Sequence, residues 1–130
     1  MTIKSSQTLV LEALDKIKTI SAKDALKLSK DKQCNLVDIR DLNELQNEGE
    51  IENSKHIPRS MLEFWIDPQN PNSADIDPGK EIVLFCAGGL RSALAAKSLQ
   101  DMGFDNVANA HGGFDLLKKV GLPVIAKEKK

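Results

Sequence analysis

One cysteine of this chain stands two residues before a pair of glycines and five residues before an arginine. In the segment FCAGGLRSALAAK, residues 85–97, Cys86 ends an apolar run that reads as a buried strand, and an alanine-rich helix follows. In open α/β sheets, ligands bind at the carboxyl ends of the strands, where the chain leaves a strand and enters the next helix. We therefore expect the turn between Cys86 and a helix starting at Arg91 or Ser92 to hold the reactive group.

The glycines in this turn allow the backbone to curl around the cysteine. Gly88 and Gly89 tolerate angles and close approaches that other residues resist. Backbone N–H groups converging on one point, together with a helix N-terminus, stabilise an anion. The same field lowers the pKa of a thiol and favours the nucleophilic thiolate. The pattern therefore indicates that Cys86 does chemistry rather than packing.

Composition limits the remaining function classes. The chain has 130 residues, 41% of them hydrophobic and 28% charged, as expected for one globular domain. A net charge of −1, a pI of about 6.1 and no tyrosine argue against a nucleic-acid partner or a membrane surface. Two cysteines cannot form a disulfide framework or a zinc site. We expect a cytoplasmic, reduced protein without metal or cofactor, in which an exposed thiol is a catalytic candidate.

Strands and helices are expected to alternate along the chain. Apolar spacing and stop residues predict helices over residues 8–18, 20–31, 40–49, 92–103 and 114–121. Short apolar runs predict strands at 35–39, 55–58, 81–85 and 106–109. Residues 61–80, with three prolines, are the longest irregular candidate. Such alternation predicts a mostly parallel sheet covered by helices on both faces.

Several segments together resemble the rhodanese-like sulfurtransferases over residues 20–125. They are LVDIRDLNEL, NEGEI, KHIPRSMLEFW, CAGGLRS and NVANAHGGFDLLKKVGLPV. The resemblance implies a three-layer α/β fold with a central, mostly parallel five-stranded sheet flanked by helices. It also implies a rhodanese-like domain at 20–126. The helix expected over residues 8–18 makes residues 1–19 a helical extension packed on this domain, and the lysines of the AKEKK segment predict a disordered tail at 127–130.

The resemblance assigns roles to the cysteine turn. Cys86 is the nucleophile, which cycles through a persulfide, Cys–S–SH. The amide cradle around its sulfur is supplied by Ala87, Gly88, Gly89, Leu90, Arg91 and Ser92. The implied reaction moves sulfane sulfur from an anionic donor, thiosulfate or polysulfide, to cyanide or a thiol, and a protein can also be the acceptor. Ala87 stands where thiosulfate-using relatives often carry arginine, so both donors stay open.

Two other readings remain. Related phosphatases and arsenate reductases space their cysteine and arginine as C-x5-R, whereas Cys86 and Arg91 are spaced as C-x4-R. The tighter loop suits a single sulfur atom better than a phosphoryl group, whose oxygens must be held together. The second reading is a binding or regulatory module of the same fold without turnover, although the cysteine and the loop length are both intact.

Outside the loop, the expected roles are mainly structural. Arg59 is the candidate for holding the donor's far end, and Phe64 and Trp65 either line the entrance or form an ordinary apolar cluster. The remaining assignments are a structural ion pair of Asp38 and Arg40, a hydrogen-bonding His56, and an inert half-buried thiol at Cys34. A Cys86–His111 pair would instead make a thiol hydrolase, a minor alternative.

Overall fold

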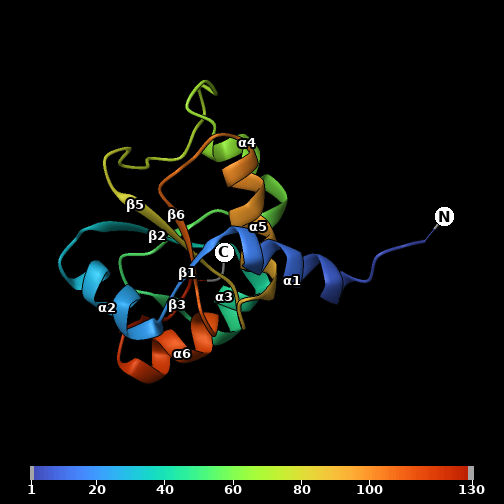
Figure 1. The fold of residues 1–130 in the computed structure, drawn as a ribbon. Helices are drawn as coiled ribbons and strands as arrows, with labels where there is room; N and C mark the ends of the chain where they lie inside the picture. The colour runs from blue at the N-terminus through green and yellow to red at the C-terminus, as the bar shows by residue number, and fades with distance from the viewer. Residues whose placement is uncertain (1, 129–130) are drawn as a thin grey trace.

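Five parallel strands form one sheet in the order β1-β6-β5-β2-β4 (Figure 1). The computed structural model describes residues 2–128. The strands of this sheet are β1 Lys18–Ile20, β2 Cys34–Asp38, β4 Lys55–His56, β5 Glu81–Phe85 and β6 Val107–Ala110. A separate antiparallel pair joins β3 Glu50–Ile51 to β7 Val124–Ile125. The predicted α/β fold with a parallel five-stranded sheet is confirmed.

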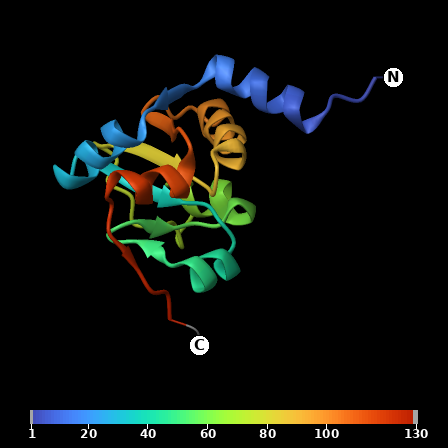
Figure 2. The same cartoon turned by 90° about the horizontal axis from the view of Figure 1, so that it is seen from below.

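Helices cover both faces of this sheet and make three layers (Figure 2). One face packs against α4 Leu62–Ile66 and α5 Leu90–Asp101, and the other against α2 Ala22–Lys30 and α6 Gly113–Val120. The other helical elements are α1 Ser6–Lys16, α3 Leu42–Glu48 and the 3-10 turn η1 Arg59–Met61. Within residues 2–128, no helix is both long enough and apolar enough to cross a membrane.

Strand β5 shows why the sequence around the cysteine is apolar without interruption. Ile82 and Leu84 lie in the core beneath α5, whereas Val83 and Phe85 lie in the core beneath α6. Successive side chains of a strand point to opposite faces, so a strand covered on both sides needs apolar residues at every position. Cys86 follows directly and lies with the α5 core.

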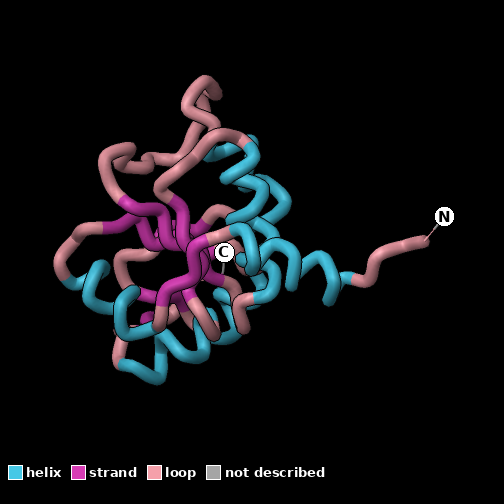
Figure 3. Tube along the Cα trace, in the orientation of Figure 1, coloured by secondary structure: helices cyan, strands magenta, loops and turns pink. Residues whose placement is uncertain are grey.

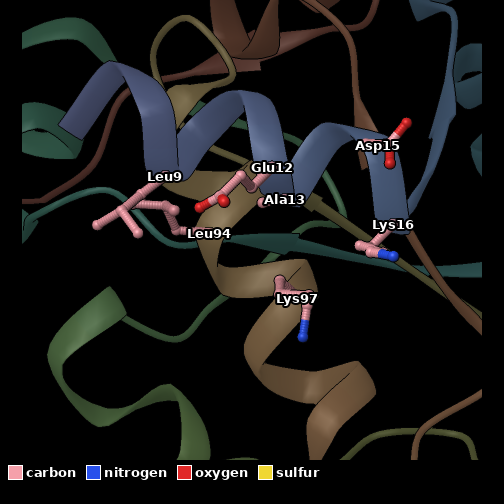
Figure 4. A pocket seen from close by; sticks show the side chains of 7 residues that line it. All are labelled: Leu9, Glu12, Ala13, Asp15, Lys16, Leu94 and Lys97. Carbon is pink, nitrogen blue, oxygen red and sulfur yellow. The ribbon is translucent and has the colours of Figure 1, made fainter. Parts of the chain in front are cut away.

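Helix α1 packs across α5 and extends beyond the edge of the sheet (Figures 1 and 2). Its N-cap is Ser5, whose Oγ accepts the Thr8 N–H at 3.1 Å, and its buried residues are Val10 and Ala13. The two helices leave a groove between them (Figure 4), lined by Leu9, Glu12, Ala13, Asp15, Lys16, Leu94 and Lys97. No member of this lining belongs to the turn that follows β5.

Two of the expected boundaries are wrong. The helix expected over residues 8–18 ends at Lys16, because Ile17 is extended and Lys18–Ile20 pairs with β6 instead. Residues 61–80 are not irregular throughout, since α4 lies within them as a short helix (Figure 3). This helix buries Leu62 and Ile66. The rest of that segment is a loop, which Asn35 fixes through two hydrogen bonds of 2.9 Å to the backbone of Asp77.

The division of the chain stays a prediction. The proposed extension at 1–19 contains α1, and it also contains Lys18 and Thr19 of β1, which belong to the main sheet. Of the predicted disordered tail, residues 129 and 130 lie outside the described residues. Lys127 lies within them, with its Nζ 3.4 Å from the Glu50 carboxylate.

Candidate active site

A short turn joins the end of β5 to the start of α5 and carries Cys86 as its first residue. Gly89 is the N-cap of α5 and has φ of 101°, a left-handed conformation that favours glycine. Gly88 is exposed. The turn therefore wraps back over Cys86 at the carboxyl edge of the sheet, where open α/β proteins bind their ligands.

The sulfur of Cys86 lies at the bottom of this turn. The Gly89 N–H donates to Sγ at 3.1 Å, and the Ser92 Oγ lies 3.5 Å from Sγ. The expectation of an exposed reactive thiol is wrong, because Cys86 is only 1% exposed. The turn therefore encloses the sulfur almost completely.

The cradle changes the acidity of Cys86. Burial is the largest single influence and opposes ionisation, but hydrogen bonds from the Ser92 side chain and from the N–H groups of Ser92, Gly89 and Gly88 outweigh it. The pKa of Cys86 is therefore lowered below its ordinary value. Amide donors and a helix N-terminus favour the thiolate in this way.

A second buried polar pair supports Ser92 from behind. Its Oγ lies 2.5 Å from Asn109 Oδ1, and Asn109 Nδ2 lies 3.5 Å from the Gly89 carbonyl oxygen. Ser92 and Asn109 are 0% and 2% exposed. Asn109 was missed in the sequence, although a polar residue between Ala108 and Ala110 in a buried strand is a signal that could have found it.

The turn before α6 holds the cradle from the other side. The Phe114 N–H donates to the Cys86 carbonyl at 2.7 Å, and the Asp115 N–H lies 3.4 Å from the Ala87 carbonyl. Gly113 packs so tightly here that an added Cβ would lie 2.3 Å from the Cys86 carbonyl oxygen. Gly113, the first residue of α6, therefore allows its backbone to approach that of Cys86 and Ala87.

Arg91 is held on the outside of the loop by Glu44 of α3. Its two terminal nitrogens donate to the two Glu44 carboxylate oxygens at 2.7 and 2.9 Å. These hydrogen bonds raise the pKa of Arg91 and lower the pKa of Glu44. The pair is bidentate and fixes the direction of the guanidinium. Glu44 lies 47 residues from Arg91 in the sequence, and no sequence pattern links the two.

Arg59 follows β4 at the same edge of the sheet and is also paired. Its NH1 donates to both Glu63 carboxylate oxygens at 2.9 Å, and Ser98 donates to the same carboxylate at 2.6 Å. Burial opposes ionisation of Glu63, but these donors hold its pKa below the ordinary value. The Arg59 side chain is 34% exposed, so it meets solvent while bound.

The pair of Asp38 and Arg40 is present and fully buried. Arg40 donates to Asp38 at 2.8 Å and to the Gly49 carbonyl at 2.9 Å, with both charged side chains 0% exposed. Its guanidinium also lies 3.9 Å from the centre of the Phe114 ring. His56 Nε2 donates to the Arg40 carbonyl at 2.7 Å. These contacts join the end of β2 to the surroundings of the cradle.

Comparison with known proteins decides the family. The model of the rhodanese-like domain matches residues 21–119. This chain belongs to the rhodanese-like family.

Relatives of this rhodanese-like chain include named sulfurtransferases. It is 31% identical to the thiosulfate sulfurtransferase GlpE of Shewanella oneidensis over 78% of this chain and 92% of that protein. The polysulfide-sulfur transferase homodimer of Wolinella succinogenes is 35% identical, with a TM-score of 0.71 over 94% of this chain and 88% of that one. A protein of unknown function from Rhodopseudomonas palustris, described as a possible tyrosine phosphatase, is 42% identical, with a TM-score of 0.84 over 96% and 98%.

The remaining predicted residues of the rhodanese-like chain lie apart from the sulfur. Cys34 is the first residue of β2 and lies at the amino end of the parallel strands, opposite to Cys86. Burial and then the charge of Glu81 raise the pKa of its thiol to about 11. His111 is exposed, and within residues 2–128 the side chain bonded to the Cys86 sulfur is Ser92, so the geometry does not support a Cys86–His111 pair. Phe64 and Trp65 are exposed on α4.

Proposed function

We propose that this protein is a sulfurtransferase that carries sulfane sulfur on Cys86 as a persulfide. The donor is an anion, thiosulfate or a polysulfide, and the acceptor is cyanide or a thiol, which a protein can present. The cycle needs a free thiol, and both cysteines are free. We therefore place the reaction in the reducing cytoplasm.

The arrangement around Cys86 is the observation that carries this proposal. Its sulfur accepts the Gly89 N–H at 3.1 Å inside a turn that is capped by a helix. Such a site stabilises a small anion without a base, a metal or a cofactor. The 1% exposure of Cys86 favours transfer of one terminal sulfur atom over reaction at a branched, bulky centre.

Loading transfers one sulfur and releases the rest of the donor. The Cys86 thiolate attacks the outer sulfur of thiosulfate, a new S–S bond forms, and the old S–S bond breaks with its electron pair leaving on sulfite. Charge balances, because one thiolate and one dianion give a persulfide anion and one sulfite dianion. The cradle amides hold the negative charge on Cys86 before the attack and on the persulfide after it.

Unloading reverses the roles of the two sulfurs. Cyanide or a thiolate attacks the terminal sulfur of the persulfide, the Cys86 S–S bond breaks, and the electron pair returns to Sγ. The leaving group is then the Cys86 thiolate. A thiol of lower pKa leaves faster, so the cradle that activates the nucleophile also assists its departure.

A phosphatase is the alternative function that one similar structure suggests. The Rhodopseudomonas palustris protein is described as a possible tyrosine phosphatase. Against that function stand the C-x4-R spacing and the two hydrogen bonds that bind both terminal nitrogens of Arg91 to Glu44. A transferred phosphoryl group needs several donors for its oxygens at once. Arsenate reduction would meet the same obstacle, and a module without turnover would not need the amide donors at Cys86.

Intact mass after incubation with thiosulfate or polysulfide tests the proposal. The protein is expected to gain one sulfur atom, which cyanide or a reductant then removes. Cys86→Ser should abolish the gain, and Cys34→Ser, the matched control, should leave it intact. Hydrolysis of an aryl phosphate without any sulfur gain would favour the phosphatase. Neither activity would favour the binding module, and equal loss from both cysteine variants would indicate a two-cysteine relay instead.

A further inference from the structure

The Ser92 hydroxyl lies between two groups that each accept a hydrogen bond. Its oxygen is 3.5 Å from the Cys86 sulfur and 2.5 Å from Asn109 Oδ1. A serine hydroxyl has one proton to donate. Ser92 is 0% exposed, so solvent does not supply a second donor. The sulfur and the amide oxygen therefore compete for one proton.

The orientation of Asn109 decides that competition in the present geometry. Its Nδ2 lies 3.5 Å from the Gly89 carbonyl oxygen, an acceptor, which leaves Oδ1 toward Ser92. The reversed amide would put Oδ1 against that carbonyl, acceptor against acceptor. At 2.5 Å the two oxygens need a proton between them, and it belongs to the hydroxyl. Ser92 therefore donates to Asn109 and accepts from the Cys86 S–H.

We propose that Asn109 is a positioning residue that sets, through the Ser92 hydroxyl, the balance between thiol and thiolate at Cys86. When Cys86 ionises, the hydroxyl turns toward the sulfur and Asn109 Oδ1 loses its donor. Asn109 is 2% exposed, so water does not readily replace that donor. The cost favours the thiol and keeps the thiolate less stable than the amide donors alone would make it.

Resting on the proposed function, this relay has a consequence for the sulfur cycle. In the persulfide, Sγ is bonded on both sides and is a poor acceptor, so the hydroxyl stays on Asn109. When an acceptor thiolate removes the terminal sulfur, the S–S electron pair returns to Sγ and the hydroxyl turns to it. Asn109 thereby restrains the leaving thiolate, and the enzyme keeps a more basic, more nucleophilic sulfur for the next loading step.

Three ion pairs lie near the cradle, and none of these three includes Asn109. Arg91 of α5 is bound to Glu44 of α3, and Arg59 of η1 is bound to Glu63 of α4. Arg40, two residues after the end of β2, is bound to Asp38, the last residue of that strand. The exposed groups at the turn into α6 are His111 and Asp115.

The test measures ionisation of Cys86 directly and needs neither donor nor acceptor. In a Cys34→Ser background, the rate of alkylation by iodoacetamide is followed against pH. Asn109→Leu keeps the volume and removes the acceptor, so the apparent pKa of Cys86 should fall and the thiolate fraction below it should rise about fivefold, the effect of one hydrogen bond. Asn109→Ser, too short to reach Ser92, should act in the same direction if the leucine variant does not fold.

Two comparisons separate positioning from packing. In a Ser92→Ala background the same Asn109 substitution should change the thiolate fraction by less than about twofold, because the proton in dispute is gone. Asn35→Leu removes another buried amide, which lies near the amino end of β2 and far from the cradle. It should leave the pH dependence of Cys86 alkylation unchanged. An unchanged pKa in Asn109→Leu, an equal shift with or without Ser92, or an equal shift in Asn35→Leu would overturn the proposal. Absence of sulfur gain in the unaltered protein, with the shift in Asn109→Leu intact, would count against the proposed function alone.

Discussion

At the scale of single residues, the two cysteines show how surroundings decide reactivity. Burial raises the pKa of Cys34 to about 11, whereas Cys86, buried more deeply, has a lowered pKa. The difference is the set of donors, because Cys86 has amides and a hydroxyl directed at its sulfur. At any given pH a larger fraction of Cys86 than of Cys34 is therefore thiolate, although both residues are the same chemical group.

Arg59 is where we expect the far end of an anionic donor to bind. Arg59→Ala should raise KM for thiosulfate about two- to fivefold at low salt with little change in kcat, since a partly exposed arginine acts through attraction that salt screens. Because Glu63 neutralises Arg59, Glu63→Gln should lower KM instead. Steady-state kinetics across ionic strength measure both effects.

Lys18 offers a matched control for that experiment. It is also a cation in an ion pair, with Glu81 at 3.0 Å, but it lies at the amino end of the sheet, away from Cys86. Lys18→Ala should leave KM unchanged at every salt concentration. An Arg59→Ala enzyme that behaved like the Lys18→Ala enzyme would assign Arg59 to the scaffold.

At the scale of elements, the turn between β6 and α6 forms the back wall of the cradle. Gly113 has φ of 57°, and a Cβ added to it would lie 2.3 Å from the Cys86 carbonyl oxygen. Gly113→Ala should therefore push the two backbones apart, break the Phe114 hydrogen bond to Cys86 and nearly abolish sulfur loading. Urea unfolding should show a loss of about 3 kcal/mol or more, as expected for overpacking at a strained position.

Gly103 separates crowding from backbone strain. It has φ of 107° and nothing within 4 Å of an added Cβ. Gly103→Ala should cost about 1–2 kcal/mol, from the left-handed conformation alone, and leave loading intact. Similar losses in the two variants would show that the approach of Gly113 to the cradle is not what matters.

Elements with a strong local signal could be predicted from the sequence. Strand β5 and the start of α5 are marked by an uninterrupted apolar run and two glycines, and Ser21 caps α2 as expected, accepting the Asp24 N–H at 3.0 Å. Strand β1 has no such signal, because its three residues become a strand only by pairing with β6. The role of Glu44 likewise depends on a tertiary contact between distant segments, whereas Asn109 is marked in the sequence as a polar residue within a buried strand.

At the scale of the whole molecule, Arg40 links several elements beneath the surface. Its guanidinium contacts Asp38 at the end of β2, Glu48 at the end of α3, Gly49 before β3 and Phe114 of α6, and no part of it is exposed. Removing one partner of such a pair leaves a buried charge without compensation. Arg40→Ala should therefore lower the free energy of unfolding by about 3–5 kcal/mol.

The double variant Asp38→Leu/Arg40→Met tests the cause of that loss. Replacing both charges with apolar groups of similar size removes the uncompensated charge, so most of the stability should return. Denaturant unfolding of the single and double variants measures the coupling. A double variant as unstable as Arg40→Ala would show that the hydrogen bonds of Arg40, rather than charge balance, hold these elements together.

The pairing of β3 with β7 joins two segments that the ribosome makes at different times. Ile51 is 0% exposed in the finished fold, and its strand partner is Val124. While the ribosome is still synthesising the central strands, the edge of β3 therefore has no partner and stays open to other chains. Only after Ile125 has been added can the pair close, and this pairing joins the middle of the chain to a segment made much later. Slow synthesis through β5 and β6 would prolong this aggregation-prone interval.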